Sequence, residues 1–226
     1  MQPGGSLFSK LRHECHDDWQ RYVSHPFVAG IQDGTLKADS FKHYLIQDYL
    51  FLIHFARAFG LAAFKSQTID QIQIAGRSLH AIIEIEMALH IDFCKDWGIS
   101  EQEMCNAPEA KETIAYTSYV LERGMSGDLL DLYVAMSPCI CGYAEIGIRL
   151  KNDPSTRIEE NPYTAWINMY ASDEIQNEMQ ENIKIIDKLF MLLGSDARIP
   201  NLTKTFLYAT QLETNFWEMG LNKAHY

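Results

Sequence analysis

The sequence has few residues that interrupt helices and few positive charges. Only seven of the 226 residues are proline, and most of these fall between segments with a helical period. Lysine and arginine number 19 against 30 aspartates and glutamates, which gives a formal net charge of −11. A nucleic-acid-binding protein is expected to carry a basic surface, so this deficit argues against a nucleic acid as partner.

Long apolar runs are also scarce. We find no segment with the roughly 18 consecutive apolar residues that a membrane-spanning helix requires, so no membrane contact is expected. Residues 1–14 lack the apolar core of a signal peptide, which predicts a cytoplasmic protein. We expect residues 1–5 to form a flexible tail.

Cysteine is present but does not form a disulfide pattern. The five cysteines are odd in number and irregular in spacing, which favours free thiols. Two of them form C-x-C, which differs from the C-x-x-C of redox and zinc sites. The five are Cys15, Cys94, Cys105, Cys139 and Cys141.

The sequence that remains is helical almost throughout. No strand-like alternation and no internal repeat is visible, and short connections predict antiparallel neighbours. We therefore predict an all-α, single-domain bundle over residues 1–226, in which Gly98, Gly124 and Gly194 end helices. The expected helices are 6–24, 38–64, 69–97, 109–124, 127–151, 160–170, 173–193 and 198–221.

Two carboxylates interrupt the apolar faces of predicted helices. Asp48 lies on the stripe that includes Phe41, Leu52 and Phe59, and Glu213 lies on the stripe of the last helix. Burying a carboxylate is costly unless the group is paired or protonated. Either residue alone is more often a structural hydrogen-bond acceptor.

Cys139 faces the same core from a third helix. Cys139 and Tyr143 are spaced i,i+4 and share one face. Pro138 cannot donate to the carbonyl of Val134, so we expect the helix to kink just before the cysteine and leave room for a ligand. A lone cysteine is usually an ordinary core residue, but a thiol and two carboxylates on three inward faces indicate a reaction site.

Glu86 and His90 form a second polar pair, also spaced i,i+4. A metal site is one interpretation. However, di-iron bundles use Glu-x-x-His twice with two further glutamates, whereas this spacing is Glu-x-x-x-His and occurs once. We therefore predict a structural Glu86–His90 pair and no metal.

Aromatic residues make up 12% of the chain, and most should belong to the core. Several lie close to the polar positions and are candidates for the walls of a pocket that holds a flat ring. These candidates are Tyr49, Phe51, Tyr116, Tyr119, Tyr143, Tyr163 and Tyr170.

Seven short motifs in a fixed order carry a family resemblance. They are HPFVAGIQDGTL (25–36), FKHYLIQD (41–48), EIEMALH (84–90), AYTSY (115–119), PCICGYAEIG (138–147), WINMY (166–170) and ETNFW (213–217). Through them the chain resembles, over nearly its whole length, the TenA/thiaminase II family of aminopyrimidine aminohydrolases.

The resemblance implies a haem oxygenase-like fold without haem, no cofactor, and a homotetramer. It implies a pocket for 4-amino-5-aminomethyl-2-methylpyrimidine or thiamin. Hydrolysis of either would release 4-amino-5-hydroxymethyl-2-methylpyrimidine, which is recycled into thiamin. The choice between the two substrates depends on the pocket volume beyond the pyrimidine.

The resemblance also assigns roles to individual residues. The nucleophile of the family corresponds to Cys139, its proton-donating acid to Glu213 and its pyrimidine-binding aspartate to Asp48. Its pocket tyrosines correspond to Tyr116, Tyr143 and Tyr170. Some members have a tyrosine, thought to help activate the cysteine, where this chain has Phe51.

Two other functions fit the same pattern. One is an oxidase on the same scaffold, cofactorless or di-iron, which would require more inward histidines and carboxylates than the sequence supplies. The other is a pyrimidine-binding or regulatory protein without turnover, which would be stabilised by the ligand but release no product.

Overall fold

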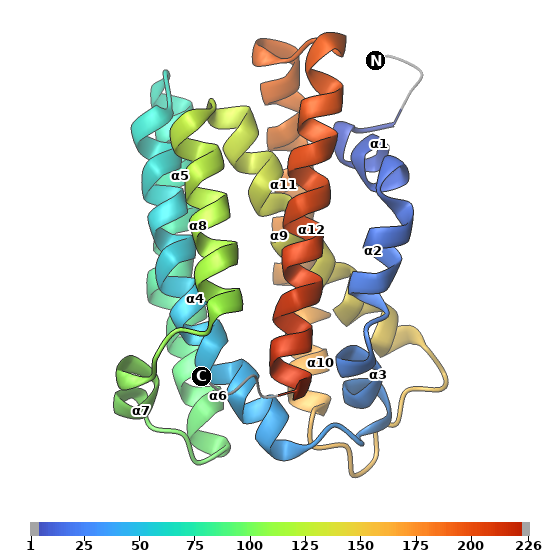
Figure 1. Ribbon diagram of the computed structural model, residues 1–226. Helices are drawn as coiled ribbons and strands as arrows, with labels where there is room; N and C mark the ends of the chain where they lie inside the picture. Colours follow the sequence, from blue (N-terminus) through green and yellow to red (C-terminus); the bar gives the residue numbers. More distant parts are fainter. Residues whose placement is uncertain (1–4, 223–226) are drawn as a thin grey trace.

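Four long helices form the frame of the structure, a computed structural model that describes residues 5–222 (Figure 1). They are α4 (Ala38–Lys65), α9 (Leu129–Asn152), α11 (Asp173–Leu193) and α12 (Ile199–Asn222). The described part of the chain contains helices and connections but no β-strand, so the predicted all-α class is confirmed.

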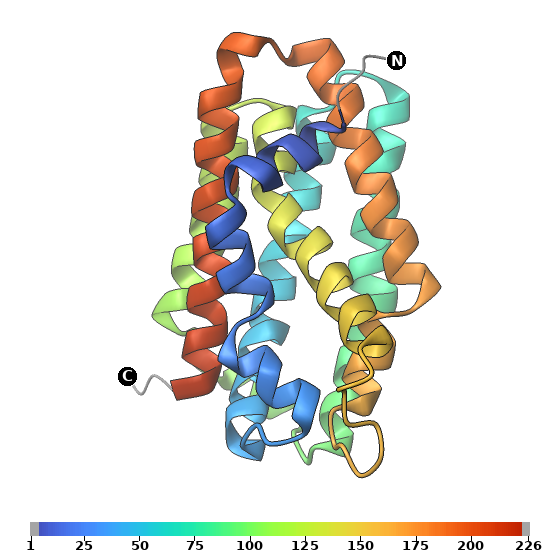
Figure 2. The same cartoon turned by 90° about the vertical axis from the view of Figure 1, so that its right-hand side faces the viewer.

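Shorter helices surround this frame. Along one side, α2 packs against α9 and α12 (Figure 2). The shorter elements are α1 (Leu7–Glu14), α2 (His16–Val23), α3 (Pro26–Asp33), α5 (Ile69–His80), η1 (Ala81–Glu86), α6 (Met87–Asp96), α7 (Glu101–Asn106), α8 (Lys111–Ser126), α10 (Thr164–Tyr170) and η2 (Asp196–Arg198).

The predicted helices match the observed ones with few exceptions. The segment 6–24 is divided at Cys15, and α3 and α7 were not predicted. Gly124 does not end α8, which continues to Ser126. Of the expected tail, only Gly5 belongs to the described residues, and residues 1–4 lie outside them.

The long rod at 69–97 contains a change of helix type. Helices α5 and α6 are joined without a break by η1, a six-residue π-helix. A π-helix inside an α-helix is rare and is frequent at functional sites. Its last residue is Glu86, so the predicted polar motif begins at this irregular turn.

The core is rich in aromatic side chains, and the apolar faces of α4 and α9 are buried in it. Trp217 stacks on Phe27 at a centroid distance of 4.9 Å and lies 5.1 Å from Tyr143. Contrary to our expectation, α4 and α9 are long and apolar enough to cross a membrane by length and composition alone. However, 61% and 78% of their most apolar windows are buried inside the protein, as in the core helices of a bundle.

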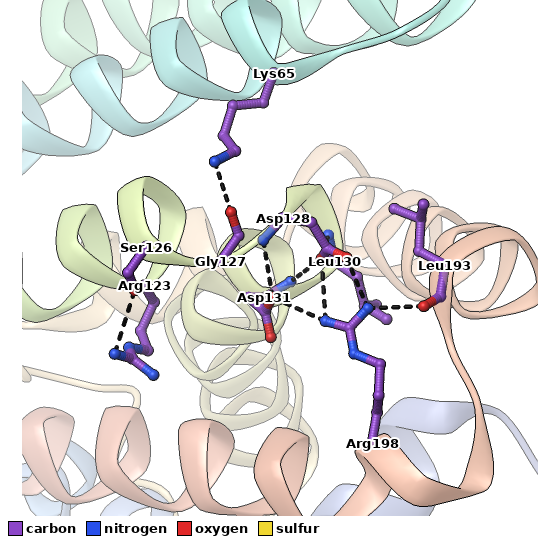
Figure 3. A network of polar contacts seen from close by, with 9 residues as sticks. All are labelled: Lys65, Arg123, Ser126, Gly127, Asp128, Leu130, Asp131, Leu193 and Arg198. Atoms are coloured by element: carbon purple, nitrogen blue, oxygen red, sulfur yellow. Dashed lines mark hydrogen bonds and ion pairs between the residues drawn. The ribbon is translucent and has the colours of Figure 1, made fainter.

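A polar clamp joins the starts of α9 and α12 (Figure 3). The side chain of Arg198 donates to Asp128 Oδ2 at 2.7 Å, to Asp131 Oδ2 at 2.8 Å and to the carbonyl of Leu193 at 2.7 Å. Asp128 and Asp131 also form the capping box of α9. The clamp therefore ties the N-terminal ends of the two helices to each other, and both helices run in the same direction through the bundle (Figure 1).

Candidate active site

A cavity of about 630 Å³ lies between α4, the α5–η1 rod, α9, α10 and α11. Its volume lies within the range of small-molecule sites. Five of the seven residues predicted from the sequence line it: Asp48, Phe51, Cys139, Tyr143 and Tyr170. The structure thus brings residues from three distant segments to one cavity.

The other two predicted residues lie immediately behind the cavity wall. Glu213 is 1% exposed, and its Oε1 accepts a hydrogen bond of 2.8 Å from the hydroxyl of Tyr116. The thiol of Cys139 lies beside the Glu213 carboxyl and interacts with it. Glu213 therefore connects the cysteine in the wall with a fully buried tyrosine.

Burial controls the protonation of this pair. It raises the pKa of Glu213 to about 8, although the hydrogen bond from Tyr116 opposes the shift. Burial also raises the pKa of Cys139 well above its usual value, and the charges of Glu213, Asp48 and Glu86 act in the same direction. At neutral pH the pair is therefore a thiol beside a protonated carboxyl.

Asp48 lies in a different electrostatic setting. Its Oδ2 accepts from the Tyr44 hydroxyl at 3.3 Å and lies 3.6 Å from Nδ1 of His90, whose Nε2 donates to the Leu45 carbonyl at 2.8 Å. Burial raises the pKa of Asp48 to about 6, against the opposing effects of His90 and Tyr44. Asp48 is therefore ionised at neutral pH while Glu213 is protonated, so a base lines the cavity and an acid lies directly behind its wall.

Aromatic rings form much of the remaining inner surface. Tyr143 and Tyr170 lie with ring centroids 4.8 Å apart and planes inclined at 49°. Phe51 lies 5.0 Å from Tyr116 and 5.8 Å from Phe216. Such rings bind a flat aromatic ligand by stacking and edge contacts.

Two predictions about neighbouring residues are wrong. Glu86 and His90 do not form the expected pair, because both ring nitrogens of His90 face Leu45 and Asp48 while Glu86 lines the cavity. Besides Tyr116, which lies behind the wall, three of the candidate aromatic residues are also absent from the cavity wall. Tyr49 contacts Cys105 Sγ, and the hydroxyls of Tyr119 and Tyr163 donate to the carbonyls of Thr205 and Leu36.

The sequence did not reveal the supports of Asp48. Trp166 Nε1 donates to the Tyr44 hydroxyl at 3.3 Å, so a short polar chain leads from α10 to the carboxylate. Tyr44 was visible only as one aromatic residue on the stripe of Asp48. The signal that could have found His90 is its place on the inward stripe of 69–97, facing an aspartate that needed a partner.

The fold and the site together define a class of protein. It is a helical bundle in which a buried thiol, a protonated carboxyl and an ionised carboxylate lie at an aromatic cavity of small-molecule size. A sequence profile of the TENA/THI-4/PQQC family matches residues 13–223. The chain therefore belongs to this family.

Individual relatives agree with this assignment. An aminopyrimidine aminohydrolase from Halalkalibacterium halodurans is 37% identical, with 96% of each chain covered. A crystal structure described as a TenA family transcription regulator from a Silicibacter species is 43% identical, with a TM-score of 0.91 over 97% of this chain and 98% of the other.

A more distant structure identifies the fold. It is a domain of unknown function with a heme oxygenase-like fold from Shewanella denitrificans. This domain is 12% identical, with a TM-score of 0.75 over 96% of this chain and 92% of the other. The expected haem oxygenase-like architecture is confirmed.

Proposed function

We propose that the protein hydrolyses 4-amino-5-aminomethyl-2-methylpyrimidine, thiamin or both, and releases 4-amino-5-hydroxymethyl-2-methylpyrimidine. The observation that carries this proposal is the pairing of the Cys139 thiol with the buried carboxyl of Glu213 at the wall of an aromatic cavity. The name of the Halalkalibacterium relative supports the same reaction.

The pyrimidine is held by charge and by shape. The ionised carboxylate of Asp48 accepts a hydrogen bond from the ring's exocyclic amino group and fixes its orientation. Tyr143, Tyr170 and Phe51 enclose the ring. The cavity is larger than a pyrimidine alone requires, so thiamin and the aminomethyl compound both fit its volume of about 630 Å³.

Cys139 and Glu213 carry out the chemistry. The Cys139 sulfur adds to an electron-poor ring carbon as its proton passes to Glu213, and the proton of Glu213 passes to a ring nitrogen. The ring electrons then expel the leaving nitrogen, which keeps the electron pair of the C–N bond. Water adds to the exposed methylene carbon, and loss of the thiol restores the ring.

This proton relay also explains how the site works with Phe51. A phenylalanine cannot hydrogen-bond a thiolate, and burial disfavours a preformed thiolate at Cys139. Coupling the addition of sulfur to proton transfer through Glu213 avoids a free thiolate. Activation of the cysteine therefore falls to Glu213 rather than to a hydroxyl at position 51.

The test is product release from each substrate separately, followed by chromatography and mass spectrometry. Cys139→Ser should lower turnover by about 10³-fold or more, because the covalent route is lost. The matched control is Cys141→Ser, since Cys141 contacts Asn182 and does not line the cavity. Calorimetry with the hydroxymethyl product should show intact binding in both variants.

The same experiment separates the alternatives. Binding of the pyrimidine without product from wild type would indicate a binding or regulatory protein, the role that the words "transcription regulator" give to the Silicibacter relative. The net charge of −11 opposes a DNA-binding role. Metal analysis of the purified protein tests the oxidase, for which His90 is poorly placed because both its nitrogens are engaged.

We also infer a cytoplasmic homotetramer, in line with the family resemblance. Several large apolar side chains are strongly exposed, including Phe64 (86%), Met191 (79%) and Met125 (72%). The tetramer would cover such side chains where they form a contiguous patch. Light scattering coupled to size-exclusion chromatography measures the mass directly, and a monomer would contradict this inference.

A further inference from the structure

Glu86 is the one carboxyl of the inner cavity that the proposed reaction does not use. It closes the π-helix η1 and contributes to the cavity wall. Within residues 5–222, no hydrogen bond or ion pair engages its carboxyl group, whereas Asp48 and Glu213 each have protein partners. A carboxyl that faces a ligand cavity without a protein partner is available to a ligand.

The position of Glu86 places it beside the reacting centre. Its charge is felt at Asp48, at the Cys139 thiol and at Tyr170, so it lies near the groups that would surround the pyrimidine. It also interacts electrostatically with Glu178 of α11, which lines the same cavity. Glu86 is therefore within electrostatic range of the groups that would surround the pyrimidine and of the acidic residues that α11 contributes to the wall.

The outer part of the cavity is acidic. Its wall carries Glu174, Glu178 and Glu181, and Arg77 is the single basic side chain among the lining residues. Burial raises the pKa of Glu178, and the charge of Glu174 adds to this shift. A cavity lined by charges of one sign attracts ligands of the opposite sign and disfavours anions such as phosphate esters.

Both candidate substrates carry a positive charge at the same atom. The aminomethyl compound has a protonated amine on the methylene carbon, and thiamin has a quaternary thiazolium nitrogen there. The hydroxymethyl product is neutral at this position. A carboxylate beside the methylene carbon would therefore bind substrate more tightly than product.

We propose that Glu86 is the cation-binding group of the cavity, which holds the positively charged leaving nitrogen and distinguishes substrate from product. This inference rests on the proposed function, because it takes the leaving group from that reaction. Glu86 keeps the amine in its ammonium form until the C–N bond breaks. The bond's electron pair then goes to nitrogen, and ammonia leaves as a neutral molecule.

The protonation of Glu86 should change when such a ligand binds. Burial raises the pKa of Glu86 to about 8, and the charges of Asp48 and Glu178 add to the shift. An unoccupied site near neutral pH therefore holds this carboxyl largely protonated. A bound cation favours the carboxylate, so Glu86 should release a proton when the cationic ligand binds.

The test compares Glu86→Gln with Glu84→Gln, which removes the same charge from an exposed position of the same π-helix. Both changes are made in the Cys139→Ser background so that substrate is not consumed. Calorimetry measures the Kd of thiamin, the aminomethyl compound and the hydroxymethyl product. Buffers with different ionisation enthalpies report the number of protons released on binding.

We expect Glu86→Gln to weaken binding of the charged ligands by about 10- to 100-fold and to leave product binding within about 3-fold. Proton release with thiamin should be present in the Glu84→Gln control and absent in Glu86→Gln. Equal loss for charged and neutral ligands, or no loss for either, overturns the proposal. If the product does not bind even with Glu86 intact, the proposed function itself has failed.

Discussion

Replacing Glu213 by glutamine should make the protein more stable and less active. The wild-type group has a pKa of about 8 in the folded protein, against an ordinary value of 4.5 for a glutamate in water. The folded state therefore retains a proton that the unfolded chain has lost over this interval. The contribution of Glu213 to the free energy of unfolding is fully present below pH 4.5 and is lost as the pH rises toward 8.

The magnitude follows from the pKa difference. Each pH unit within the interval costs the wild type about 1.4 kcal/mol, so the loss between about pH 5 and about pH 7.5 is about 3 kcal/mol. Glutamine is neutral throughout and still offers an oxygen to the Tyr116 hydroxyl. Glu213→Gln should therefore escape this loss, while turnover falls by about 10²- to 10⁴-fold because the acid is gone.

Urea unfolding, followed by tryptophan fluorescence at a series of pH values, measures the effect. The difference in free energy of unfolding between variant and wild type should grow with pH and level off above about pH 8. Glu84→Gln, at an exposed position, is the control and should leave the pH profile unchanged. A constant difference across the series would refute the assignment of a protonated Glu213.

Two further changes test the supports of the site. His90→Ala removes a group that lowers the pKa of Asp48, so the pH midpoint of product binding should rise above about 6, and a rise to about 7 would lower affinity at pH 7 by about 2-fold. Calorimetry across pH checks this, and an unmoved midpoint would contradict it. Gly147→Ala places a Cβ about 2.3 Å from the carbonyl carbon of Tyr170, so thermal unfolding should show a loss of about 1–3 kcal/mol. Gly76→Ala, with nothing within 4 Å, should instead stabilise by about 1 kcal/mol, and equal effects of the two would argue against the close approach.

The long helices could be predicted because their sequence period is strong and few prolines interrupt it. Helix α4 was expected at 38–64 and runs over Ala38–Lys65. Helix α7 was missed because six residues are too few to show a period, although its Ser100–Glu103 capping box is a local signal. The π-helix η1 was missed because its residues have the same apolar pattern as the α-helix on either side.

In the candidate site, too, some features could be predicted from the sequence and others could not. Inward stripes identified Asp48, Cys139 and Glu213, since a periodic pattern reports which face of a helix is buried. The same pattern placed Glu86 and His90 on one face but could not say what lies across from them. In the structure, His90 contacts the backbone carbonyl of Leu45 and the carboxylate of Asp48, whereas Glu86 faces the cavity. Partners of this kind depend on packing between distant segments.

The clamp at Arg198 holds together the starts of the two helices that carry the reactive pair, Cys139 and Glu213. Cys139 lies ten residues beyond Leu129 and Glu213 fourteen beyond Ile199, which corresponds to about 15 Å and about 21 Å along two helices whose N-terminal ends are clamped to each other. One residue gained or lost in either interval would shift its side chain by about 1.5 Å and turn it by about 100°. The lengths of the intervals 129–139 and 199–213 therefore determine whether the thiol and the carboxyl meet.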